Sequence, residues 1–267
     1  MAHRIIYRPR GLEYAHFRTL EEQCFPEEPM LQSQFHTLLK RDHWIVYQDT
    51  HPVGYGTYAQ QEDLAWIKRI GVSSPHRRQG IGTQLLQTIL DHCRTRGLYK
   101  SILYVQQDNQ EALRLYAKHA FKRAGSASRY LVPLNQFYTD FAGFPTHGIT
   151  ASPLHETADS LWPVFSGQWA DLPALHDPPR QYVLLFQMER TQNIGYCRLA
   201  PEFGGCFPLV VIRPTHYLPG ALLALKPYLP AEKKYLKLTL DDPHLIQTCQ
   251  GFNFPLDYKM YRMEKNR

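Results

Sequence analysis

The sequence predicts an α/β protein with a mixed central sheet flanked by helices, built as two tandem copies. Strand and helix patterns alternate along the chain, the same order of patterns occurs twice, and the two halves differ in charge. Strand–helix–strand order requires some parallel pairing within the sheet. With 267 residues, the chain is long enough for two small domains that each bury a core.

The elements of the first half follow from the spacing of apolar residues. A strand over 4–8 precedes a helix over 11–25, which stops before Pro26, and a second helix covers 30–40. Two strands over 43–49 and 52–60 form a hairpin, because the residues between them favour a turn. The remaining elements are a strand over 64–72, a helix over 80–96, a strand over 99–105, a helix over 109–120 and a strand over 128–134.

The second half repeats this order. A hairpin over 181–189 and 193–200 is followed by a strand over 206–212, a helix over 218–229, a strand over 234–240, a helix over 242–252 and a strand over 257–264. A repeat of this length indicates a domain duplication rather than a solenoid. We expect a first domain at 1–134, a linker rich in turn-forming residues at 135–152, and a second domain at 153–267.

Charge and cysteine content exclude several classes of protein. The net charge of +6 belongs to residues 1–134, which carry 18 Lys and Arg against 12 Asp and Glu, while residues 135–267 carry 12 of each. No run of basic residues indicates nucleic-acid binding, and no apolar run approaches the roughly 18 residues that cross a membrane. The five cysteines are scattered and never spaced Cys-x-x-Cys, which predicts reduced thiols, a cytoplasmic location and no metal site.

The stretch 76–86, "HRRQGIGTQLL", places two arginines and two glycines directly before a helix. A helix start leaves backbone N–H groups unpaired, and those donors together with the helix dipole bind phosphate. Glycines at positions 80 and 82 allow close approach to the main chain, and Arg77 and Arg78 add charged donors. From these residues alone, a phosphate cradle and an ordinary strand-to-helix turn both remain open.

Neighbouring motifs narrow this choice. Arg77-x-x-Gly80-x-Gly82 resembles the (Gln/Arg)-x-x-Gly-x-(Gly/Ala) signature of the GNAT superfamily of N-acetyltransferases. The resemblance extends over residues 4–134. It includes Ile70-Gly71-Val72 and Pro75 before the loop, and Asn109, Ala112, Leu115, Tyr116 and Phe121 after it.

The resemblance implies an acetyl-CoA-dependent N-acetyltransferase without a metal ion. In such a protein the strand before the loop splays from its neighbour after a bulge, and its main chain at Ile70, Gly71 and Val72 would bind the pantetheine arm. Asn109 would bond the pantetheine or diphosphate side, and Tyr116 would protonate the departing thiolate, unless it is only a core aromatic residue. The diphosphate would be held by the loop and helix start, namely Arg77, Arg78, Gln79, Gly80, Ile81, Gly82 and Thr83.

The general base is not identified by the sequence. Relatives place a glutamate on the strand before the loop or on the following strand, where this chain has Trp66, Lys68, Arg69 and Tyr104. A carboxylate at Glu62 or Asp63 or the imidazole of His43 could act through a water, and bulk solvent could suffice for an acceptor of low pKa.

The acceptor also stays open, between a small-molecule amine and a peptide or protein amine. Lys68 and Arg69 favour an anionic group on the acceptor. A set of carboxylates favours a cationic amine instead; these are Glu21, Glu22, Glu27 and Glu28.

The second half lacks the basic loop. With Val211 and Pro214 aligned to Val72 and Pro75, Pro219 falls opposite Gly80, and Pro219 has no N–H group to donate. The helix over 242–252 would end in Gly251-Phe252, with Gln247 and Cys249 where a proton donor is sought. We therefore expect a degenerate domain that no longer binds acetyl-CoA. A non-catalytic acetyl-CoA sensor or assembly protein is the alternative to an enzyme.

Overall fold

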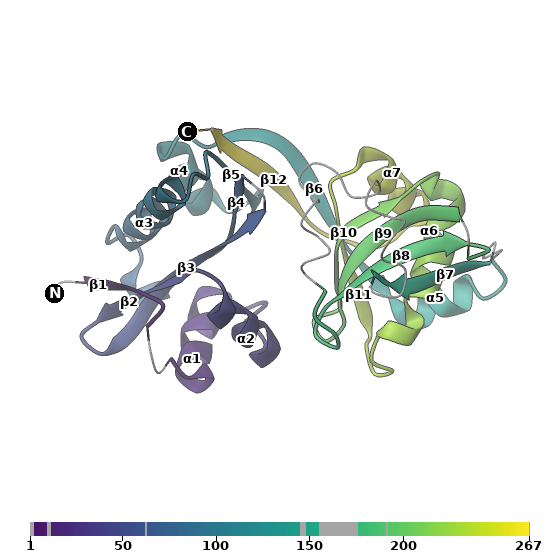
Figure 1. Ribbon diagram of the computed structural model, residues 1–267, viewed down its shortest axis with the longest axis horizontal. Coiled ribbons are helices and arrows are strands. Elements are labelled where there is room, and N and C mark those ends of the chain that lie inside the picture. Colours follow the sequence, from purple (N-terminus) through teal and green to yellow (C-terminus); the bar gives the residue numbers. More distant parts are fainter. Residues whose placement is uncertain are drawn as a thin grey trace. The chain divides into compact units, whose positions relative to one another are not determined.

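The computed structural model describes residues 3–9, 12–61, 63–144, 148–154, 176–190 and 192–266. The chain forms two compact units (Figure 1). Unit 1 contains Met1–Ala124 together with Arg262–Arg267, and unit 2 contains Gly125–Tyr261. Each unit is a sheet with helices packed on it, which confirms the predicted α/β class. Within the described ranges, no helix is long and apolar enough to span a membrane.

Unit 1 begins with an antiparallel sheet and continues into a parallel pair. Strands β1 to β4 pair in sequence order as antiparallel neighbours, and β5 lies parallel to β4. The elements in chain order are β1 (His3–Tyr7), α1 (Tyr14–Cys24), α2 (Gln32–Lys40), β2 (His43–Gln48), β3 (His51–Gln61), β4 (Leu64–Val72), α3 (Ile81–Thr95), β5 (Lys100–Gln106) and α4 (Gln110–Lys118).

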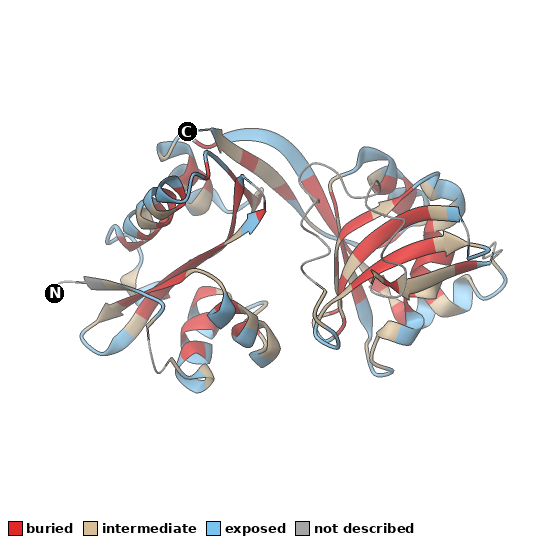
Figure 2. Cartoon of the chain, viewed as in Figure 1, coloured by how far each residue is buried: buried red, intermediate tan, exposed pale blue. Residues whose placement is uncertain are grey.

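Helices cover both faces of this sheet. On one face, Phe17 and Leu20 of α1 pack with Phe35 of α2 against Tyr55 of β3. On the other face α3 lies so close to β3 that a Cβ atom at Gly56 would be 2.7 Å from Cδ1 of Ile89. The residues coloured as buried lie along the strands and on parts of these helices (Figure 2). The alternation predicted from the sequence therefore corresponds to two helical layers around one sheet.

From β8 onward, the described elements of unit 2 follow the order that unit 1 shows from β2 to α4. Strand β6 (Lys122–Pro133) crosses from unit 1 into unit 2 and pairs antiparallel with β11. The others are α5 (Leu134–Asp140), β7 (Ile149–Pro153), β8 (Tyr182–Met188), β9 (Gln192–Ala200), β10 (Gly205–Val211), α6 (Pro214–Ala224), β11 (Tyr235–Leu240), α7 (Pro243–Gly251) and β12 (Leu256–Asn266).

Strand registers show that the two units repeat one design. In unit 1, Gly54 pairs with Val46 on one side and with Val72 on the other. In unit 2, Gly195 pairs with Phe186 and with Val211 in the same way. Val72 and Val211 therefore occupy equivalent positions, as their spacing to Pro75 and Pro214 predicts.

The compact units differ from the ranges predicted for the domains. The predicted linker, 135–152, contains most of α5 and most of β7, and Phe137 of α5 is buried in the core of unit 2. At the other end, Arg262–Arg267 belongs to unit 1, where β12 is the neighbour of β5. Lys100 of β5 and Glu264 of β12 approach to 3.6 Å between Nζ and Oε2.

Candidate active site

The β4 strand separates from β5 beside a bulge. Thr57 pairs with Arg69 and Tyr58 with Ile67, so Lys68 is an extra residue in β4. The ladder between β4 and β5 joins Leu64–Trp66 to Lys100–Ile102 and does not continue along the described strands. Along Ile70, Gly71 and Val72, the main-chain groups on the β5 side consequently have no ladder partner among the described strands. This is the bulge and splay expected from the family resemblance.

The loop between β4 and α3 leaves a set of backbone donors unused. The N–H of Gln84 donates to the Gly80 carbonyl at 3.0 Å. In the part of the chain that the structure describes, the N–H groups of residues 78–83 donate to no protein acceptor. These donors lie at the start of α3, where the helix dipole is positive. The arrangement fits a diphosphate group.

The two glycines of the loop serve different purposes. Gly80 precedes α3 with φ +82°, a conformation that L side chains rarely adopt, and a Cβ atom there would have nothing within 4 Å. Gly82 lies inside α3, and a Cβ atom there would meet Leu115 at an ordinary 3.5 Å. Packing within the protein therefore does not require glycine at either position. Backbone conformation requires it at Gly80.

The two arginines of the loop also differ. Arg77 donates from Nε to the Val72 carbonyl at 3.1 Å, so it fastens the loop to the end of β4. Arg78 is exposed and has a positive φ of 62°. Of the two, Arg78 is the one whose guanidinium makes no hydrogen bond or ion pair within the described residues. Arg78 is thus the better placed to meet an anion.

Helix α4 carries the last two predicted site residues. Asn109 caps the helix, because its Oδ1 accepts from the N–H of Ala112 at 3.0 Å. Tyr116 is 8% exposed and lies edge-on to Phe121 with 5.9 Å between ring centroids. Burial raises the pKa of Tyr116 to about 12, so its hydroxyl remains protonated at neutral pH. A hydroxyl in this state could donate a proton but could not act as a base.

Of the candidate general bases Glu62, Asp63 and His43, the two that the structure describes differ from each other in their surroundings. Glu62 lies outside the described residues, and Asp63 is exposed in the turn that precedes β4. His43 is 2% exposed, its Nδ1 lies 2.9 Å from the Arg41 carbonyl, and burial lowers its pKa. On β4, the Lys68 ammonium lies 3.1 Å from the ring centroid of Trp66.

The acidic residues at the end of α1 and just after it differ in burial, so they do not form one exposed group of carboxylates. Glu21 is fully buried, with its Oε2 2.7 Å from Nη1 of Arg69. Glu22 is exposed and accepts from Arg18 at 2.7 Å. The acceptor-attracting role expected for four carboxylates therefore does not extend to Glu21, whose charge is met by Arg69.

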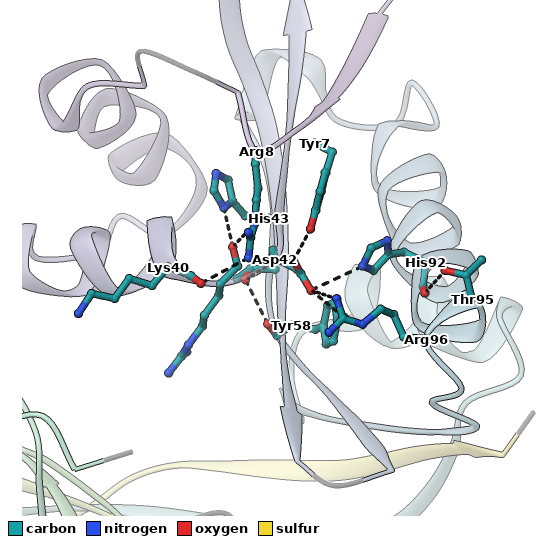
Figure 3. A network of polar contacts seen from close by, with 11 residues as sticks. Tyr7, Arg8, Lys40, Asp42, His43, Tyr58, His92, Thr95 and Arg96 are labelled. Atoms are coloured by element: carbon teal, nitrogen blue, oxygen red, sulfur yellow. Dashed lines mark hydrogen bonds and ion pairs between the residues drawn. The ribbon is translucent and has the colours of Figure 1, made fainter. Parts of the chain in front are cut away.

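A polar network that the sequence does not reveal surrounds Asp42 at the start of β2 (Figure 3). Tyr7 and Tyr58 donate to its carboxylate, and Arg8 lies 3.0 Å away. From α3, His92 and Arg96 approach it at 3.5 and 3.6 Å. The network joins β1, β3 and the last turn of α3, whereas the loop between β4 and α3 precedes the first turn of that helix. We assign it to stability rather than to chemistry.

In unit 2 a helix replaces the loop. Two residues separate the end of β10 from the start of α6 at Pro214, whereas eight residues, including a short 3-10 helix over Ser74–His76, separate the end of β4 from the start of α3 at Ile81. Pro219, predicted to lie opposite Gly80, is inside α6. The N–H groups of His216 and Tyr217 donate to the Arg213 carbonyl, and proline has no N–H, so the donors that unit 1 leaves open are absent or used here.

The second helix of unit 2 corrects part of the predicted alignment. Asp242 caps α7 as Asn109 caps α4. The N–H of Phe254 donates to Cys249, as that of Phe121 donates to Tyr116. Asn253-Phe254, rather than Gly251-Phe252, is thus equivalent to Ala120-Phe121, because each pair starts with a positive φ.

This equivalence puts Cys249 in the position of Tyr116, where burial raises the pKa of the thiol to about 12. Between the start of α6 and α7 lies an open cavity of about 550 Å³, lined by uncharged or weakly basic side chains; these are Pro214, Thr215, His244, Gln247, Thr248, Gly251 and Phe252.

Comparisons with known proteins agree with this geometry. Residues 13–121 match the Acetyltransferase (GNAT) family model. The chain is 32% identical over 74 residues to N-alpha-acetyltransferase 50 of Danio rerio, covering 27% of this chain and 44% of that protein. It is 41% identical over 64 residues to mycothiol acetyltransferase of Corynebacterium glutamicum, covering 24% of this chain and 22% of that one. The chain thus spans less than half the length of each of these two relatives.

Over the whole chain, the fold matches a tandem GNAT protein from the clavulanic acid biosynthesis pathway. The TM-score is 0.70 at 14% identity, and the match covers 99% of this chain and 98% of that one. The splayed strands, the open donors before α3 and the family match all fall within unit 1. The part of the chain that matches the GNAT acetyltransferase family model thus lies within unit 1, and the chain as a whole has the fold of that tandem GNAT protein.

Proposed function

We propose that unit 1 transfers the acetyl group of acetyl-CoA to a primary amine. The observation that carries this proposal is the row of unused N–H groups over residues 78–83, placed directly after the splayed end of β4. A diphosphate and an amide-containing arm fit that combination, and coenzyme A contains both. The names of the relatives, an N-alpha-acetyltransferase and a mycothiol acetyltransferase, support acetyl transfer.

In this proposal the cofactor follows the free edge of β4. The main chain of Ile70, Gly71 and Val72 bonds the pantetheine arm, and the N–H groups of residues 78–83 bind the diphosphate with help from the exposed Arg78. Since Asn109 uses its Oδ1 as a helix cap, only its amide NH₂ is left to donate to the arm.

The reaction is a direct transfer. The amine nitrogen bonds to the thioester carbonyl carbon, the carbon–sulfur bond breaks, and the electron pair stays on sulfur. Tyr116 gives its hydroxyl proton to that thiolate, and the proton lost from the nitrogen passes to solvent, from which the tyrosine is reprotonated. A thiol pKa near 8.5 in water lies well below the value of about 12 for Tyr116, so this proton transfer is favourable only where the desolvation that raises the tyrosine pKa also raises the pKa of the departing thiolate. The five cysteines are free, which suits a reducing cytoplasm.

Thiol release monitored by absorbance tests the proposal. Purified protein is mixed with acetyl-CoA and a panel of amines that includes a peptide with a free α-amino group, spermidine and glucosamine. Release that depends on one amine, with the acetylated product found by mass spectrometry, supports the enzyme. Tight binding of acetyl-CoA without release on any amine would instead indicate a sensor. Absence of acetyl-CoA binding would contradict both.

A further inference from the structure

A buried ion pair joins α1 to β4 on the face opposite α3. Glu21 is 0% exposed, and its Oε2 lies 2.7 Å from Nη1 of Arg69. The hydroxyl of Tyr55, also fully buried, donates to the other carboxylate oxygen. A buried carboxylate is stable only when its oxygens have such partners, so this pair is costly to break.

The same two side chains hold the connection between α1 and α2, residues 25–31. Glu21 accepts from the N–H of Met30 at 2.6 Å, and Nη2 of Arg69 donates to the Glu28 carbonyl at 2.8 Å. The guanidinium also lies over the ring of Phe25, 4.3 Å from its centroid. Both ends of the connection are therefore fastened to one ion pair.

The connection between α1 and α2 packs closely against β4, the strand proposed to bind the cofactor. A Cβ atom at Gly71 would lie 2.8 Å from the Phe25 ring and 2.9 Å from Cβ of Cys24, closer than real side chains approach. The end of α1 also contacts the phosphate loop, because Ser74 donates from Oγ to the Gln23 carbonyl at 3.4 Å. The connection thus borders the strand that carries Ile70, Gly71 and Val72.

We propose that Glu21 and Arg69 are positioning residues that hold the α1–α2 connection as one wall of the amine-acceptor site. The proposal rests on the acetyl transfer proposed for unit 1. Neither residue takes part in bond making. Because Glu21 neutralises Arg69, the arginine is not a receptor for an anionic acceptor, and the exposed carboxylate of Glu27 is the charge that this wall presents.

Steady-state kinetics of Glu21→Gln and Arg69→Gln test the proposal with the best acceptor of the amine panel. The KM for that acceptor should rise about tenfold or more, because a wall displaced by even 1 Å misplaces the nitrogen, while the KM for acetyl-CoA stays within about twofold. Arg69→Lys retains the charge beside Glu21 but loses the second hydrogen bond, so its acceptor KM should fall between wild type and Arg69→Gln.

Matched controls lie beside the pair. Glu22→Gln and Arg18→Gln break an exposed ion pair on the same helix and should leave both KM values unchanged. If the buried variants fold poorly, Tyr55→Phe removes one hydrogen bond to Glu21 and should raise the acceptor KM less strongly. Amide hydrogen exchange should become faster over residues 25–31 in all three pair variants and not over residues 78–83.

Each outcome has a distinct meaning. Faster exchange over residues 25–31 with an unchanged acceptor KM would overturn the proposal, since the connection would move without affecting the acceptor. Equal rises in both KM values would also overturn it, because the pair would then support the whole site. A wild type that transfers acetyl to no amine would reject the proposed function itself, which is a different result.

Discussion

Tyr116 has a chemical environment that suits one direction of proton transfer. Its ring packs on Phe121 in a buried position, and the pKa of about 12 that results from burial keeps it protonated across the working pH range. A donor with so high a pKa does not lose its proton below about pH 11, so a decline of activity between pH 7 and 10 cannot come from this residue.

Replacing Tyr116 with phenylalanine removes only the hydroxyl. We expect kcat to fall about 10²-fold because the thiolate then leaves without a proton, with the KM for acetyl-CoA nearly unchanged. Thiol-release kinetics measure both values. Tyr99→Phe, at a tyrosine that is 62% exposed, is the matched control and should behave as wild type. An unchanged kcat in Tyr116→Phe would show that Tyr116 is only a core residue.

The individual residues of the cofactor strand, loop and α4 were accessible from the sequence because they lie in one local pattern of short spacings. The pairing of Glu21 with Arg69 could not be predicted from the sequence, because the two residues are far apart in the chain and meet only when α1 packs on β4. The sequence also does not reveal that Asn109 uses its Oδ1 as a helix cap, since both roles require the same residue type at the same place.

At the scale of elements, the difference between the units is a loop in one and a helix in the other. Pro214 begins α6 where unit 1 continues into the loop that ends at Gly80. Counting from the equivalent residues Val72 and Val211 places Pro219 opposite Gly80 but does not show that α6 starts before Pro219. Proline is favourable at the first turn of a helix, but the equivalent Pro75 of unit 1 lies in a short 3-10 helix, Ser74–His76, so the proline alone does not identify the earlier start.

The unused N–H groups in the loop between β4 and α3 predict that the neighbouring Arg78 helps to bind the diphosphate of acetyl-CoA. Arg78→Asn removes the guanidinium and keeps a side chain that tolerates positive φ, so folding should be unaffected. The affinity for acetyl-CoA, measured by calorimetry, should fall about fivefold, and the loss should shrink at high salt. Arg94→Asn, an exposed arginine at the other end of α3, should bind as wild type. Equal affinities of Arg78→Asn and wild type would place the anion elsewhere.

The Asp42 network should stabilise unit 1 in a pH-dependent way. Burial alone would raise the pKa of Asp42, but hydrogen bonds from Tyr7 and Tyr58 and the charges of Arg8 and His92 outweigh it and hold the pKa below its usual value. A lowered carboxyl pKa contributes stability above the unfolded value of about 3.9, and that contribution disappears as pH falls through the folded value.

The substitution Asp42→Asn tests this pH-dependent contribution to the stability of unit 1. At pH 7 the free energy of unfolding should fall by about 2 kcal/mol, less than for a fully buried pair because Arg8 and Arg96 are half exposed. The difference in unfolding free energy between wild type and Asp42→Asn should become smaller below about pH 4. Urea denaturation followed by fluorescence measures it, and Asp91→Asn at an exposed pair serves as control. A difference in unfolding free energy that stays constant with pH would argue that the ionised Asp42 carboxylate is not the source of this stability.

At the scale of the whole molecule, one cofactor site per chain is expected. Unit 1 has the open donors and the excess of positive charge, whereas α6 uses or lacks the equivalent donors in unit 2. Calorimetric titration with acetyl-CoA should therefore give a stoichiometry near one. A stoichiometry near two would mean that the cavity between α6 and α7 accepts the cofactor without a loop.

The last strand is shared between the two compact units. Met260 belongs to unit 2 and Met263 to unit 1, although both are buried on β12. Met263→Ala should cost about 2 kcal/mol or more in unit 1 and increase hydrogen exchange in β5, whereas Met260→Ala should act on unit 2. Hydrogen exchange with mass spectrometry distinguishes them. Faster exchange in the same unit for both variants would contradict this division.

The order of elements and the duplication were predictable from periodicity, which is a local property of the chain. The ends of the units were not, because a strand pattern such as 257–264 carries no information on the sheet that it joins. The position of β12 beside β5, the pairing of Lys100 with Glu264 and the burial of Met263 reveal that the final residues belong with the first sheet.

The place of Arg262–Asn266 in unit 1 has a consequence for synthesis. Nascent domains usually fold in order as they leave the ribosome, the N-terminal one first. Here β5 has no neighbour on its outer side until residues 262–266 have been translated, well after all the other strands of that sheet have emerged. Unit 1 can begin to fold during translation but is completed last, so a prematurely terminated chain would carry every site residue of unit 1 and still lack the strand that closes its sheet.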